Sequence, residues 1–168
     1  MQIIHFNSSN SVTRLKKAIQ LSAKKAPVFM CVGTDAVLSD SLGPKVGTIL
    51  SRYPDKVTVY GMEGDNITAS NVGSSYTEIR SKHPDSTVIV IDAAVGREDQ
   101  IGNIEIFNGG VLPGAATNKD LGKMGDVGII GIITSKDMDD FYTRREERDV
   151  YVSCIAKVIA KAILRAVA

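Results

Sequence analysis

Hydrophobic residues recur at the spacing of an α-helix in several stretches of the chain. In the first of them, Leu15 and Ile19 share one face, and lysines occupy the others. A proline near the start of the second stretch is compatible with a helix, because the first turn needs no N–H donor there. The pattern predicts helices over residues 11–25, 42–51, 69–81 and 146–167.

Between these stretches lie short apolar runs that are typical of β-strands in a sheet covered on both faces. The runs comprise residues 28–32, 57–60, 87–91, 102–107 and 127–134, with a further short strand around His5. Strands that alternate with helices favour crossover connections and a mainly parallel sheet between layers of helices. The sequence therefore predicts a three-layer α/β/α fold.

The length of 168 residues supports one domain over residues 1–168, because a second domain would leave too little chain for either core. Apolar residues make up 43% of the chain, which is typical of a globular protein.

The formal net charge is only +1, with acids and bases interspersed, so we expect no nucleic-acid or anionic membrane partner.

The N-terminus and the cysteines indicate the compartment. The first residues turn polar quickly and lack the basic, apolar and small-residue regions of a signal peptide, and no stretch is long and apolar enough for a membrane span. Cys31 and Cys154 are the two cysteines, and they form no CxxC motif. We therefore expect a protein of the reducing cytoplasm.

Asp40 lies between an apolar strand and a helix, in the most informative segment of the chain, residues 33–44. Gly33 permits a tight exit from the strand, and Asp40 or Ser41 stands where the helix begins and its N–H groups favour a carboxylate. Two interpretations stay open. Asp40 is either a helix N-cap or a catalytic acid.

Asp92 follows four consecutive apolar residues, 88–91, so burial should raise its pKa. In open α/β sheets the ligand crevice lies beyond the carboxyl ends of the strands, and both aspartates fall at that edge. Asp92 either organises its own turn or shares a proton with Asp40. In the second case one carboxyl group activates a water and the other protonates the leaving nitrogen.

Nucleotide motifs are missing from the sequence. The segment after the first apolar strand contains neither a Gly-Lys-Ser/Thr phosphate loop nor a GxGxxG fingerprint. We therefore expect no nucleotide cofactor, and no other cofactor is indicated.

Three motifs occur in order over residues 28–134. They are Asp-Ser-Leu-Gly-Pro at 40–44, Ile-Asp-Ala-Ala at 91–94 and Gly-Val-Leu-Pro-Gly-Ala at 110–115. Together they resemble the spore-protease-like sporulation proteins of endospore-forming bacteria, relatives of germination protease and, more distantly, of hydrogenase maturation endopeptidases. The resemblance implies the three-layer fold of those endopeptidases and aspartate-dependent hydrolysis of spore proteins.

The resemblance also assigns roles to residues. Germination protease is thought to use two aspartates in motifs that match Asp40 and Asp92. Its Gly-Met-Glu segment matches residues 61–63, and its Pro-Gly loop is followed by a basic residue. In the loop 108–126, which could cover the pair, Lys119 would bind substrate or stabilise an oxyanion; solvated surface charges are the other interpretation. The substrate-binding candidates are Thr34, Asp35, Ser41, Glu63 and Lys119.

Departures from these families limit the inference. Ser39 stands where germination protease has proline, and the chain is shorter and lacks the propeptide region. Hydrogenase maturation endopeptidases recognise a metal with two acidic residues and a histidine that follows the second of them. In this chain both histidines, His5 and His83, precede Asp92, so we expect no metal.

The sequence therefore predicts a cytoplasmic peptidase of a spore-forming bacterium that acts on a protein or peptide. An inactive relative that binds peptides as a regulatory module is the alternative, and a metal-assisted hydrolase is a third. The apolar stripe of the last helix could form a homo-oligomer face or pack in the core.

Overall fold

The computed structural model describes residues 1–113, 122–136 and 145–168 of the chain. The strands are β1 (Gln2–His5), β2 (Pro27–Cys31), β3 (Thr58–Tyr60), β4 (Thr87–Gly96), β5 (Asn103–Asn108) and β6 (Val127–Ser135). The helices are α1 (Ser11–Ser22), α2 (Leu42–Leu50), α3 (Val72–Lys82) and α4 (Arg145–Ala166), with short 3₁₀ turns η1 (Leu38–Asp40) and η2 (Glu98–Gln100).

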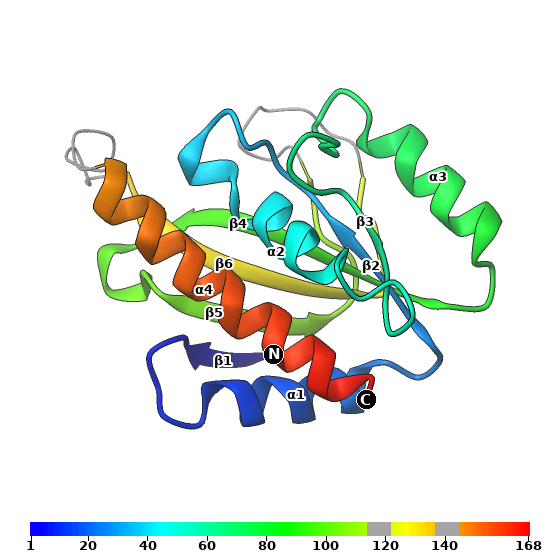
Figure 1. Ribbon diagram of the computed structural model, residues 1–168, viewed down its shortest axis with the longest axis horizontal. Coiled ribbons are helices and arrows are strands. Elements are labelled where there is room, and N and C mark those ends of the chain that lie inside the picture. Colours follow the sequence, from blue (N-terminus) through cyan, green and yellow to red (C-terminus); the bar gives the residue numbers. More distant parts are fainter. Residues whose placement is uncertain (114–121, 137–144) are drawn as a thin grey trace.

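All six strands form one mixed sheet in the order β1-β5-β6-β4-β2-β3. Strands β3, β2, β4 and β6 are parallel, whereas β5 runs antiparallel to β6 and β1 antiparallel to β5. Helices α1, α2 and α4 cover one face, and α3 lies on the other (Figure 1). The predicted three-layer α/β/α fold is confirmed.

The core divides along the sheet because successive side chains of a strand point to opposite faces. Ile89 and Ile91 of β4 pack with α1, α2 and α4, while Val88 and Val90 pack with α3. On the α3 face the segment after β5 adds cover. Its Val111 and Met124 pair as an isolated bridge and are buried in the same cluster as Val88.

Asp126 fixes this covering segment to the sheet. Its Oδ2 accepts a hydrogen bond from the Val88 N–H at 2.8 Å, and its Oδ1 accepts one from Arg80 of α3 at 2.7 Å. The sequence left two interpretations for the loop over residues 108–126: a cover over the aspartates or a surface loop with solvated charges. The described parts of that loop therefore serve the core as well.

The connections that leave β2 and β4 run in opposite directions. The chain goes from β2 through α2 to β3 on one side, and from β4 through η2 to β5 on the other. Adjacent strands with diverging exits define the topological switch point of a parallel sheet, where ligand crevices form. Asp40 belongs to the first of these connections, and Asp92 lies in β4 itself, one residue beyond the last pair of β4 with β2.

Helix α2 approaches the strand ends closely because glycines face them. A Cβ atom on Gly43 would lie 2.0 Å from the Val32 carbonyl oxygen, and one on Gly47 would lie 1.8 Å from that of Gly61. Both clashes are with backbone, which cannot move aside cheaply.

Among the residues that the structure describes, no helix is long and apolar enough to cross a membrane.

We expect Gly47→Ala to lower the free energy of unfolding by about 2 kcal/mol or more, because the methyl group would force α2 away from the strand ends. Gly73→Ala is the matched control. That helical glycine has nothing within 4 Å of an added Cβ, so its substitution should be neutral or stabilise by about 0.5–1 kcal/mol. Chemical denaturation measures both, and equal values would contradict the close packing.

Candidate active site

Asp92 lies inside β4, at the position where this strand loses one neighbour. Strand β2 pairs with β4 only as far as Cys31 opposite Ile91, but β6 stays paired, with Ile130 opposite Asp92. The prediction that the strand ends at Ile91 is wrong, because backbone pairing with β6 extends β4 to Gly96. Asp92 therefore stands at the end of β2, at the switch point.

The surroundings of Asp92 are apolar. By strand alternation its side chain shares the α3 face with Val88 and Val90, and the paired Ile130 is 9% exposed. Burial raises the pKa of Asp92 to about 7, although the Ala93 N–H, which donates to its Oδ1 at 2.8 Å, opposes the shift. The charge of Asp40 raises this pKa further.

Asp40 ends the turn η1, which contacts β4. Its carbonyl oxygen accepts a hydrogen bond from the Thr34 N–H at 2.9 Å, and Gly33 makes this closure possible with φ +137°. A Cβ on Gly33 would lie 2.2 Å from that same oxygen. Asp40 is not the N-cap of α2: that position is Ser41, which makes no side-chain cap bond.

Burial also raises the pKa of the Asp40 carboxyl group, and the Thr34 backbone lowers it. Two partly buried carboxyl groups whose charges repel cannot both ionise easily. The charge of Asp40 therefore favours the protonated form of Asp92.

The other predicted substrate-binding residues are spread around this loop. Thr34 Oγ1 accepts the Ala36 N–H at 3.2 Å, and Asp35 Oδ2 accepts the Gly64 N–H at 2.8 Å. Ser41 is 3% exposed, and its hydroxyl group already donates to the Leu38 carbonyl oxygen at 2.7 Å.

Glu63 is exposed in the turn after β3. Lys119 lies outside the described residues, so its predicted role stays a prediction.

Lys45 of α2 was not singled out by any sequence motif. Its Nζ lies 3.0 Å from Asp149 Oδ1 of α4 and 3.8 Å from Glu63 Oε1, and its side chain is only 17% exposed. The lysine therefore joins the helix that follows Asp40 to α4 and to the turn after β3. No spacing in the sequence links these three residues.

Two other reactive side chains among the described residues are buried or hydrogen-bonded. Burial raises the pKa of the Cys31 thiol, so a reactive thiolate is disfavoured there. His83 Nε2 lies 2.8 Å from the Tyr60 hydroxyl, as a partner of a strand residue. Within residues 1–113, 122–136 and 145–168, no group of three or more His, Cys, Asp or Glu side chains is placed to hold a metal ion.

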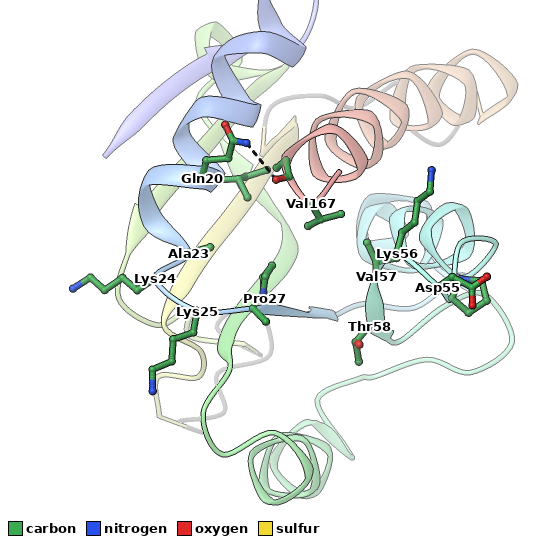
Figure 2. Close-up of a pocket in the computed structure, with 14 residues that line it drawn as sticks. Gln20, Ala23, Lys24, Lys25, Pro27, Asp55, Lys56, Val57, Thr58 and Val167 are labelled. Carbon is green, nitrogen blue, oxygen red and sulfur yellow. Dashed lines mark hydrogen bonds between the residues drawn. The ribbon is translucent and has the colours of Figure 1, made fainter.

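A cavity of about 660 Å³ lies at the opposite end of the sheet, and Figure 2 shows the residues that line it. Pro27 and Thr58, which begin β2 and β3, line it together with Lys56 and Val167. Neither Asp40 nor Asp92 is part of this wall. Because the strands are parallel, the aspartates lie at their other ends.

We expect Asp92→Asn to change how stability depends on pH. A carboxyl group that titrates near 7 in the folded protein and near 4 in the unfolded chain loses stabilising free energy as pH rises between those values. The variant lacks this loss. Its free energy of unfolding should exceed the wild-type value above about pH 7, by at most about 4 kcal/mol, and match it below about pH 4.

Denaturation across this pH range measures the effect, and Asp55→Asn, at an exposed position, serves as the control. An Asp92→Asn curve parallel to that of the wild type would contradict the raised pKa.

The fold and this geometry define a class: three-layer α/β proteins with a pair of carboxyl groups at the switch point of a mainly parallel sheet. The chain matches the family model described as "Protein of unknown function (DUF1256)" over residues 3–162, and it belongs to that family. It is 33% identical over 152 residues to "Uncharacterized protein YyaC" of Bacillus subtilis (strain 168). The alignment covers 90% of this chain and 74% of the relative. Neither description names a protease, so the relation to germination protease remains a proposal.

Proposed function

We propose that this protein is a peptidase that hydrolyses peptide bonds with Asp40 and Asp92. The observation that carries the proposal is the position of Asp92 just past the end of β2, in a buried setting that raises its pKa and with Asp40 near enough to raise it further. Perturbed acids in a crevice are typical of catalytic sites. If the two aspartates only held their turns together, we would expect hydrogen bonds to lower the pKa values of both carboxyl groups.

The two carboxyl groups divide the work according to their pKa values. Asp92 keeps its proton more readily and donates a hydrogen bond to the scissile carbonyl oxygen. Asp40, as the carboxylate, takes a proton from a water whose oxygen attacks the carbonyl carbon. The tetrahedral intermediate then breaks its C–N bond as a carboxyl proton passes to the leaving nitrogen.

The substrate in this proposal is a protein or peptide, with small spore proteins as the first candidates. The motif resemblance to germination protease supports this choice. No cofactor takes part in these steps.

We expect Asp40→Asn and Asp92→Asn each to lower kcat for peptide hydrolysis by about 10²-fold or more, because each removes one proton-transfer partner. Asp55→Asn, at the opposite end of the sheet, should retain wild-type activity. The assay follows cleavage of small acid-soluble spore proteins and of a mixed peptide library by mass spectrometry. Unchanged hydrolysis in both aspartate variants would show that the site is misplaced.

The same assay separates the rival functions. Activity lost to a chelator and restored by a divalent ion would indicate a metal-assisted hydrolase. Binding of spore proteins without cleavage, lost in both aspartate variants, would indicate a peptide-binding module. For the proposed mechanism, kcat should fall as pH rises above about 7, since Asp92 then loses its proton.

A further inference from the structure

The loop that carries Asp40 is joined to the turn after β3 by a series of contacts. The Gly33 N–H donates a hydrogen bond to the Ile67 carbonyl oxygen at 2.8 Å. The Asn66 Nδ2 donates to Thr34 Oγ1 at 3.5 Å, near the upper limit for a hydrogen bond. The loop and the turn therefore lie side by side.

Asp35 makes the third contact of this series. Its Oδ2 accepts a hydrogen bond from the Gly64 N–H at 2.8 Å. A carboxylate that accepts a backbone N–H makes a charge-assisted hydrogen bond, which is roughly twice as strong as a neutral one. Because residues 33, 34 and 35 meet residues 67, 66 and 64 in that order, Asp35 joins the part of the turn that lies nearest to β3.

The position of this loop determines the position of Asp40. The Thr34 N–H donates to the Asp40 carbonyl oxygen at 2.9 Å, so the loop closes on the aspartate. Asp40 ends η1, and η1 contacts β4, the strand that contains Asp92. A shift of residues 33–35 would therefore be passed on to Asp40 and would change its distance from Asp92.

Two roles are open to the exposed carboxylate of Asp35. The sequence assigned it to substrate binding, in which its negative charge would act on the substrate. The structure gives its Oδ2 a backbone partner, the Gly64 N–H, for which only an acceptor oxygen is needed. Asparagine keeps an acceptor oxygen and lacks the charge, whereas alanine lacks both. The two substitutions therefore separate the two roles.

We propose that Asp35 is a positioning residue, which holds the loop of Asp40 near Asp92 by accepting the Gly64 N–H. The inference rests on the proposed peptidase function, since the two aspartates that it keeps together are those of the proposed reaction. Asp35 itself touches no reacting atom. Without its hydrogen bond the loop is free to move away from β4, and a misplacement of about 1 Å can lower a rate by about 10²-fold.

The position of Asp40 is tested without hydrolysis, by carbon-13 NMR titration of the Asp92 carboxyl group. We expect Asp35→Ala to lower the pKa of Asp92, because the like charge of Asp40 then lies farther away. Asp35→Asn should restore the wild-type value. Asp65→Ala is the matched control, since it removes an exposed carboxylate from the same turn and keeps the backbone hydrogen bonds of that residue with Met62.

Amide hydrogen exchange tests the contact itself. In Asp35→Ala the N–H groups of Gly64 and Thr34 should exchange about tenfold faster, which is the effect of losing one hydrogen bond to a charged group. Asp35→Asn should show the wild-type rates. The N–H of Val90, in the core of β4, should exchange equally in all variants, which would exclude a general loss of stability.

Peptide hydrolysis gives the third readout. We expect Asp35→Ala to lower kcat by about tenfold or more and to leave KM unchanged, and Asp35→Asn to restore kcat. Equal losses in both variants, with a raised KM, would show that the charge binds substrate and would overturn the positioning role.

The titration and the assay distinguish this inference from the proposed function. A wild-type pKa for Asp92 and wild-type exchange at Thr34 in Asp35→Ala would overturn the positioning role, whether or not the protein cleaves peptides. A lowered pKa in Asp35→Ala that Asp35→Asn restores, in a protein that cleaves no peptide, would support the positioning role and overturn hydrolysis.

Discussion

The burial of the Asp92 carboxyl group, near a second aspartate, is the constraint on which the proposed chemistry depends. Asp92 stands where β2 ends and β4 continues, so one side of it is open while the other remains in the sheet. Apolar neighbours remove water from its carboxyl group, and Asp40 adds a like charge. Together they hold a proton near neutral pH that an exposed aspartate would release.

Close backbone packing holds Asp40 in place. Gly33 turns the chain at the end of β2, and Gly43 and Gly47 let α2 rest on the strand ends. Side chains at these positions would clash with backbone oxygens, so the loop that carries Asp40 would have to move away from β4. The glycines of this segment therefore set the position of the loop that carries Asp40.

Much of the fold could be predicted from the sequence, because buried strands and amphipathic helices have clear patterns. The placement of Asp40 and Asp92 near the carboxyl ends of neighbouring strands followed from the strand pattern and the apolar run before Asp92. The continuation of β4 to Gly96 could not be predicted, since it depends on pairing with β6. The burial of Val111 and Met124 arises from tertiary contacts that no local spacing records.

The most direct test is a carbon-13 NMR titration of the side-chain carboxyl groups in the wild type and in Asp40→Asn. We expect the Asp92 carboxyl group to titrate near 7 in the wild type. In Asp40→Asn its pKa should fall, because the like charge is gone, yet stay above the ordinary aspartate value because burial persists. An ordinary pKa for Asp92, or one that Asp40→Asn leaves unchanged, would contradict the coupled pair.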